Sequence, residues 1–242
     1  MSDKSYQNLI NKITLGDCLD IMKSLPDKCI DLILTDPPYG EGIARREVLG
    51  SPNATTPGQY KKSDWDDKTP PPEVFQEMFR ISKNQIIFGG NFMQVEIGKN
   101  TPCYIVWDKD NTGNYADCEL AWASFPTAIK KYTWRWNGMI QQDMKNKEVR
   151  IHQTQKPVQL IKMILRDYYK KLGSTGIVMD CYSGSGSIAV ACDDMAIPFI
   201  AVEKDEEYWQ KSNERLDDVR SQLKLFNSNE RLLDVKTQLK LF

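Results

Sequence analysis

Residues 176–194 read GIVMDCYSGSGSIAVACDD. The short apolar run that ends at Asp180 is typical of a strand buried on both faces of a parallel sheet. Gly184 and Gly186 then mark a tight turn, and the apolar residues after it predict a helix. In this arrangement backbone N–H groups at the start of the helix favour polar or anionic ligand groups. The stretch therefore predicts an α/β domain with a ligand-binding turn.

The next predicted strand, at 197–205, ends close to an acidic residue, Glu203. A carboxylate at this point after a glycine turn can accept both hydroxyls of a ribose, so the unit favours an adenosine-containing cofactor. Ala189 stands where a dinucleotide fingerprint has its third glycine, which argues mildly against NAD. A simple packing turn in an α/β domain is the alternative interpretation.

Strands and helices alternate along much of the chain. Residues 13–25 predict a short strand, a turn and a helix with Asp17 as its N-cap. Further strands are predicted at 29–36, 84–91, 103–109 and 176–180, and further helices at 73–82, 158–172 and from 206 onward. This alternation predicts an α/β fold with a mostly parallel, doubly wound sheet.

Composition excludes several classes of protein. The 242 residues are 40% hydrophobic and 27% charged, enough for one large domain with a core. The net charge of -1 provides no global basic field, so any nucleic-acid binding must come from a local patch. We expect no secretory signal, no membrane span and, with His152 as the single histidine, no metal site. The six cysteines are scattered, which predicts reduced thiols in a cytoplasm.

A second motif follows the strand at 29–36, where residues 32–40 read LILTDPPYG. Ligands bind at the carboxyl edge of open α/β sheets, which is where Asp36 would lie. The prolines fix the backbone, so the Asp36 carboxylate and the Pro37 carbonyl form a pair of acceptors suited to an amine. Tyr39 offers a ring on which a base can stack. A rigid turn with an exposed tyrosine is the alternative interpretation.

Five motifs together resemble the S-adenosylmethionine-dependent amino-methyltransferases of DNA, over most of residues 13–215. They are TDPPYG at 35–40, IIFGGN at 86–91, HQTQKPVQLIKMIL at 152–165, DCYSGSGS at 180–187 and VEKDEEYW at 202–209. The catalytic motif precedes the cofactor motif, as in the permuted class called β. The resemblance implies a Rossmann-like methyltransferase fold, double-stranded DNA as substrate and S-adenosylmethionine as cofactor.

The resemblance also assigns residues. The catalytic corner is formed by Asp36, Pro37, Pro38 and Tyr39. Cofactor contacts are implied for Asp17, Asp36, Lys156, Asp180, Tyr182, Ser183, Gly184, Gly186 and Glu203. The Asp-Pro-Phe of the family is Asp180-Cys181-Tyr182 here, and we expect this departure to alter packing rather than to abolish binding.

The implied reaction is transfer of a methyl group to the amine of a base that has left the double helix. An aspartate at the first motif position accompanies adenine N6 in most of the family, whereas serine accompanies cytosine N4, so Asp36 favours adenine. Cytosine N4, RNA and protein amides stay open as alternative acceptors. Pro102-Cys103 resembles the nucleophile of carbon methyltransferases, but we interpret Cys103 as a core residue. A nucleotide-dependent dehydrogenase would leave the Asp36 motif without a role, and an inactive DNA-binding module would not need that aspartate.

Basic residues gather in 126–162, and KKYTWRWNG at 130–138 interleaves them with aromatic rings. By family order we place a target-recognition region at about 110–150. The long loop at 41–72 lacks periodicity and is predicted to be mobile and to close over DNA. The predicted DNA contacts are Arg45, Arg46, Lys61, Lys62, Lys130, Lys131, Trp134, Arg135 and Trp136. A solvated basic face over buried tryptophans is the alternative interpretation.

The end of the sequence is a duplication, in which 211–226 is followed by the closely similar 227–242. We predict a catalytic domain at 1–210 and a helical tail at 211–242. Gln222–Phe226 and Gln238–Phe242 both read QLKLF, which resembles the peptide that binds the bacterial sliding clamp. Plain helix packing is the alternative. The oligomeric state stays open, although relatives are often dimers. We expect a cytoplasmic protein encoded by a bacterium, a phage or a mobile element. Whether a restriction nuclease accompanies it also stays open.

Overall fold

The computed structural model describes residues 6–45, 48–49, 58–59, 64–111, 116–137 and 140–239. The central sheet contains β1 (Lys12–Leu15), β2 (Ile30–Thr35), β5 (Ser82–Phe88), β6 (Cys103–Asp108), β7 (Cys118–Ala123), β8 (Lys130–Thr133), β11 (Val178–Asp180) and β12 (Phe199–Glu203). Within the described residues these eight strands lie in the order β1-β12-β11-β2-β5-β7-β6-β8. Only β7 runs antiparallel to its neighbours there, so the prediction of a mostly parallel sheet is confirmed.

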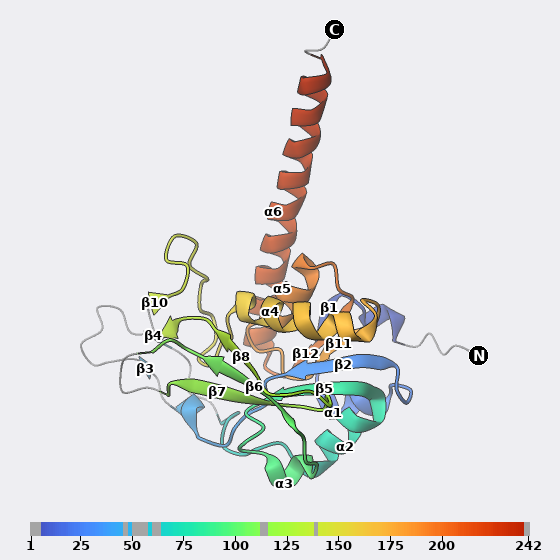
Figure 1. The fold of residues 1–242 in the computed structure, drawn as a ribbon, viewed down its shortest axis with the longest axis vertical. Helices are drawn as coiled ribbons and strands as arrows, with labels where there is room; N and C mark the ends of the chain where they lie inside the picture. Colours follow the sequence, from blue (N-terminus) through green and yellow to red (C-terminus); the bar gives the residue numbers. More distant parts are fainter. Residues whose placement is uncertain are drawn as a thin grey trace.

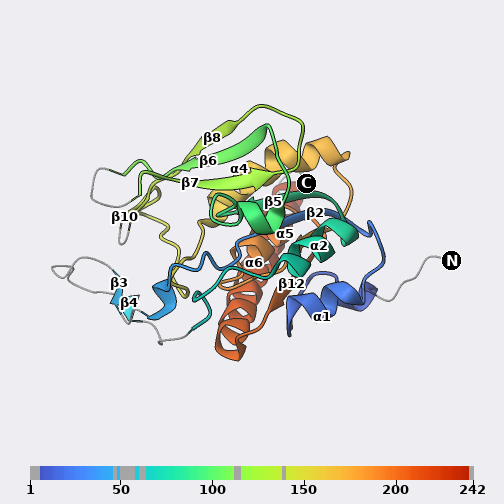
Figure 2. The same ribbon diagram turned by 90° about the horizontal axis from the view of Figure 1, so that it is seen from below.

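Helices cover both faces of this sheet (Figure 1, Figure 2). One face carries α1 (Cys18–Lys23), α2 (Pro72–Ile81) and α3 (Gln94–Ile97), and the other carries α4 (Val158–Tyr168), α5 (Ser187–Asp194) and the start of α6 (Glu206–Leu239). The doubly wound α/β prediction is therefore confirmed. Short elements complete the chain: η1 (Gln7–Leu9), η2 (Ile43–Arg45), β3 (Val48–Leu49), β4 (Gly58–Gln59), β9 (Trp136–Asn137), β10 (Ile140–Gln141) and η3 (Tyr169–Leu172).

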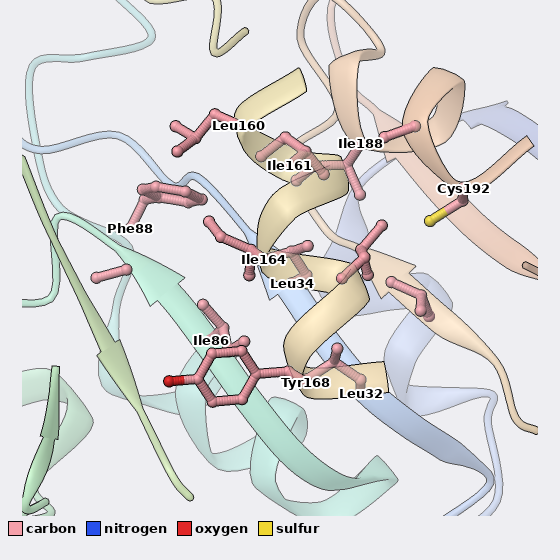
Figure 3. Packing of buried hydrophobic residues seen from close by; sticks show 14 of the residues in the cluster. Leu32, Leu34, Ile86, Phe88, Leu160, Ile161, Ile164, Tyr168, Ile188 and Cys192 are labelled. Atoms are coloured by element: carbon pink, nitrogen blue, oxygen red, sulfur yellow. The ribbon is translucent and has the colours of Figure 1, made fainter. Parts of the chain in front are cut away.

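The continuous apolar run of β2 follows from burial on both faces. Leu32 and Leu34 pack with Ile164 of α4 on one side (Figure 3), whereas Ile33 packs with Met78 of α2 on the other. All five side chains are fully buried. Truncating one of them to alanine costs about 2–5 kcal/mol in comparable cores. This double-sided core holds the end of β2 rigidly, and that end carries the predicted catalytic motif.

The boundary predicted after residue 210 falls inside α6, which is one continuous helix. Ser212 and Leu216 are buried, and Arg215 forms an ion pair with Glu148 at 2.7 Å. Arg220 contacts Asp193 of α5 at 2.7 Å. The first turns of α6 therefore belong to the catalytic body at least as far as Arg220, and the rest of the helix projects away from it (Figure 1).

The predicted clamp-binding segments lie beyond this packed part of α6. Gln222–Phe226 falls within the helix, whereas the last three residues of Gln238–Phe242 lie outside the described residues. Clamp binding therefore stays a prediction. Among the described residues, the helices are all too short or too polar for a membrane crossing.

Candidate active site

Parallel neighbours in the sheet bring the predicted functional residues to one edge. β11 lies beside β2 with Val178 opposite Leu32, and β12 and β1 follow on the other side of β11. Asp180, Asp36 and Glu203 all stand at or just after the carboxyl ends of these strands. The glycine turn and the catalytic motif therefore lie side by side, although about 150 residues separate them in the chain.

A cavity of about 530 Å³ opens at this edge. That volume falls in the range of roughly 300–1,000 Å³ that is usual for small-molecule sites. The predicted residues that line it are Asp17, Asp36, Pro38, Lys156, Asp180, Tyr182, Ser183, Gly184 and Glu203. Gly186 does not line it. A Cβ at Gly186 would lie 3.1 Å from Cβ of Ser212, so this glycine allows α6 to approach the turn closely.

The glycine turn is held by the predicted ribose acid. Gly184 adopts a φ of +50° and donates its N–H to Glu203 Oε2 at 2.6 Å, while Oε1 accepts the N–H of Asp205 at 2.8 Å. Burial raises the pKa of Glu203. The hydroxyl of Ser183 is buried and has no hydrogen-bond partner among the described residues. The partnerless Ser183 hydroxyl and the Glu203 carboxylate belong to residues that line the cavity, and such groups suit a ligand with hydroxyl and charged amino-acid groups, so the cavity fits S-adenosylmethionine.

Two further carboxylates of the cavity have structural partners. Asp17 accepts the N–H of Leu19 at 2.9 Å, as the predicted N-cap of α1, and lies 3.1 Å from the Lys204 ammonium. Asp180 accepts the Thr35 hydroxyl at 2.8 Å and the N–H of Tyr182 at 3.1 Å. Burial raises the pKa of Asp180 to about 7. Asp180 thus joins the glycine turn to the strand that carries the catalytic motif.

At the predicted catalytic corner, both oxygens of the Asp36 carboxylate already accept hydrogen bonds. Asp36 Oδ1 accepts the Tyr39 hydroxyl at 2.7 Å, and Oδ2 accepts the Lys156 ammonium at 2.5 Å. Burial raises the pKa of Asp36, and the positive charge of Lys156 opposes that rise. Lys156 lies 3.2 Å from Glu119 Oε2, and Glu119 Oε1 lies 2.5 Å from Lys109. Lys156 was expected to bind the cofactor, and its ion pairs with Asp36 and Glu119 were not predicted.

Tyr39 lies in a packed position. Its ring stacks on Phe92 with the centroids 5.1 Å apart, and Gly89 approaches it closely. The backbone around it is fixed by Asp66, whose carboxylate accepts the N–H groups of Tyr39 at 2.8 Å, Gly40 at 3.1 Å and Ile43 at 3.0 Å. Asp66, Phe92 and Glu119 were missed by sequence reasoning, because no local pattern marks them as partners of the motif.

Acidic neighbours weaken the predicted DNA-binding patch. Lys130 pairs with Asp167, Lys131 with Asp108, Arg135 with Asp110 and Arg45 with Asp67. Arg46, Lys61 and Lys62 lie outside the described residues. DNA contact by the exposed members of this set stays a prediction.

Trp134 and Trp136, which were predicted to contact DNA, lie in or against the core. Trp136 is buried in the core, and Trp134 packs against the same core while partly exposed. The ring of Trp136 therefore contributes to packing, and a base contact by either tryptophan stays a prediction. Cys103 is fully buried on β6, which confirms its interpretation as a core residue.

Comparisons with known proteins agree with this geometry. A family described as DNA methylase, of the N6/N4 methyltransferase type, matches residues 109–214. The type II methyltransferase M1.MboII of Moraxella bovis is 24% identical over 254 residues, covering 84% of this chain and 95% of its own.

Two solved structures share the architecture. A Thermus thermophilus protein in complex with S-adenosyl-L-methionine is similar with a TM-score of 0.52 and 18% identity, covering 86% of this chain and 95% of its own. The cytosine-N4-specific PvuII DNA methyltransferase is similar with a TM-score of 0.53 and 14% identity, covering 86% and 90%. Likeness at this level of identity concerns the fold alone. The chain is therefore similar to DNA methylases of the N6/N4 type over residues 109–214, and to the type II methyltransferase M1.MboII over most of its length.

Proposed function

We propose that the protein methylates the N6 amine of an adenine that has been turned out of double-stranded DNA. The observation that supports this most directly is the position of Asp36, which lines the same cavity as the glycine turn and Glu203. S-adenosylmethionine, the cofactor of the family, supplies a methyl group that its positive sulfur makes reactive. The choice of adenine rests on Asp36, because the N6/N4 methyltransferase type includes enzymes that act on cytosine N4 as well as on adenine N6.

The chain's own residues position and polarise the amine. The ionised Asp36 accepts one N–H of the amine, and the Pro37 carbonyl, whose direction Pro38 restricts, accepts the other. Accepting both hydrogens favours the tetrahedral form of the nitrogen, in which the lone pair is available for attack. Glu203, Ser183 and Asp17, which all line the cavity, hold the cofactor. Methyl transfer would break the methyl–sulfur bond as the nitrogen–carbon bond forms, and the amine would then lose one proton to the adjacent Asp36 carboxylate, so catalysis is mainly alignment of the nitrogen with the methyl group.

The decisive experiment is transfer of a labelled methyl group from S-adenosylmethionine to unmethylated DNA, followed by digestion and chromatography of the nucleosides. We expect N6-methyladenine. N4-methylcytosine would support the alternative that the family leaves open, and a full-length protein that binds the cofactor but labels no DNA would refute the proposal. Asp36→Ala should lose transfer and keep cofactor binding, whereas Asp20→Ala, on the exposed side of α1, should behave like the wild type.

We also propose that the chain from Gln222 onward tethers the enzyme to a sliding clamp, since its sequence contains both QLKLF segments. The packing of Leu216 and Arg220 shows where a truncation must begin if the catalytic body is to stay folded. A chain that ends at Ser221 removes both copies and keeps these contacts. Equal binding of the full-length and shortened proteins to purified clamp would contradict the tether.

A further inference from the structure

Glu119, on β7, reaches the catalytic corner from the antiparallel part of the sheet. Its Oε1 lies 2.5 Å from the Lys109 ammonium, which sits over the ring of Trp107. Its Oε2 lies 3.2 Å from the Lys156 ammonium, and it is a buried atom that accepts no hydrogen bond among the described residues. This buried oxygen is therefore paired with the charge of Lys156 and can accept a better-aligned hydrogen bond from it.

Lys156 therefore stands between two carboxylates. Its ammonium donates to Asp36 Oδ2 at 2.5 Å and has Glu119 Oε2 as a second acceptor within reach. The Lys156 side chain is only 5% exposed, so water cannot readily replace a lost partner. Removing one partner of a buried ion pair leaves an uncompensated charge, which is strongly unfavourable.

The proposed reaction brings a new donor, the target amine, to the buried Asp36 carboxylate, whose two oxygens are already engaged. Both of its oxygens already accept a hydrogen bond, one from Tyr39 and one from Lys156. We propose that Glu119 is a positioning residue that receives the Lys156 ammonium when the target amine binds Asp36 Oδ2. This inference rests on the proposed function, because the amine is what displaces the lysine.

The neighbouring charges are arranged for this exchange. Lys109 compensates one oxygen of Glu119 and leaves the other directed at Lys156. Lys156 therefore moves from one carboxylate to another and keeps its charge, with no proton transfer. Lys156 thus keeps a carboxylate partner for its buried charge when it leaves Asp36.

Glu119→Gln tests the proposal, because it removes the charge and nearly preserves the shape. We expect kcat for methyl transfer to fall roughly ten- to hundred-fold, with cofactor affinity little changed. Glu119→Asp, which retains a carboxylate, should recover part of that loss. Glu73→Gln, a matched substitution of an exposed residue on α2, should leave kcat unchanged.

Two readouts separate positioning from a merely structural role. In a Lys156→Met background there is no ammonium to receive, so Glu119→Gln should cause no further loss of kcat. The acid limb of the kcat profile should also move to lower pH in Glu119→Gln, because the negative charge of Glu119 contributes to the raised pKa of Asp36. The other groups that act on Asp36 here, Lys156 and Tyr39, remain in place in that variant.

The outcomes distinguish this inference from the proposed function. Wild-type protein that binds cofactor and methylates no DNA overturns both. Wild-type protein that methylates DNA, together with a Glu119→Gln variant of equal kcat, overturns the role of Glu119 alone. The role of Glu119 is also overturned if Glu119→Gln lowers kcat by the same factor in the wild-type and in the Lys156→Met background. The glutamate would then act independently of the lysine.

Discussion

Gly89 offers a sharp test of how closely the catalytic corner is packed. It follows β5 directly and has a φ of +65°. A Cβ added there would lie 2.1 Å from Cε1 of Tyr39, 2.5 Å from Cδ1 and 2.6 Å from Cζ. Carbon atoms in contact are normally about 3.5–4.0 Å apart. In Gly89→Ala the tyrosine ring must therefore move by roughly 1.5 Å, or the strand end must move away from it.

The movement carries a cost in both stability and activity. The left-handed backbone costs about 1–2 kcal/mol for a residue with a Cβ. Forcing an extra methyl group into a packed site adds about 1–3 kcal/mol. The displaced ring carries the hydroxyl that holds Asp36 at 2.7 Å, so the acceptor shifts with it. Misplacement of a reacting group by about 1 Å costs on the order of a hundred-fold in rate. We expect kcat for DNA methylation to fall by about this factor.

Gly173→Ala is the matched control for Gly89→Ala. Gly173 has a φ of +79°, and a Cβ there would meet no atom within 4 Å. It should therefore lose stability through the backbone alone and keep the wild-type kcat. A Tyr39→Ala, Gly89→Ala double variant should be no less active than Tyr39→Ala, because the clash disappears with the ring. Gly89→Ala with near-wild-type kcat, or Gly173→Ala with an equal loss, would refute this account of the corner.

Two further predictions concern residues that hold the site. Asp66→Ala leaves three backbone N–H groups without their carboxylate, so the free energy of unfolding should fall by roughly 2–5 kcal/mol in urea denaturation, whereas an unchanged value would show that the loop does not depend on Asp66. Burial and the charge of Lys156 lower the pKa of His152 to about 3. The unfolded chain therefore takes up this proton first, and stability should decline by about 1.4 kcal/mol per pH unit from about pH 6.5 downward. His152→Gln should flatten the dependence of Tm on pH between about 6.5 and 4, and parallel curves for the two proteins would contradict the assignment.

The sequence was informative wherever a functional residue ends an apolar run. Asp36, Asp180 and Glu203 each end or follow a strand buried on both faces, and the parallel arrangement puts such ends at one edge. The position of these three residues could therefore be predicted without a structure. The same is true of helix α4 and of Asp17 as the N-cap of α1. The glycine turn was recognisable for the same reason, because it lies between a clear strand and a clear helix.

Partners that come from distant strands could not be predicted in this way. Glu119 lies on β7, a strand that the sequence analysis did not identify, and its proximity to Lys156 depends on the antiparallel insertion of β7 beside β5. The acidic partners of the basic patch could not be predicted for a related reason. Asp108 and Asp167, which pair with Lys131 and Lys130, belong to β6 and α4, outside the segment whose charges were considered.

The engaged state of Asp36 determines which of its contacts an incoming amine displaces. Tyr39 OH has Asp36 as its acceptor, so displacing the tyrosine would leave a buried hydroxyl without one. Lys156 forms the stronger, charge-assisted contact, yet it has Glu119 Oε2 within 3.2 Å as a replacement. The cheaper exchange is therefore at Oδ2, where the amine replaces the lysine. Tyr39 meanwhile keeps donating its hydroxyl to Oδ1, so this hydroxyl holds the Asp36 carboxylate in its orientation while the amine binds Oδ2.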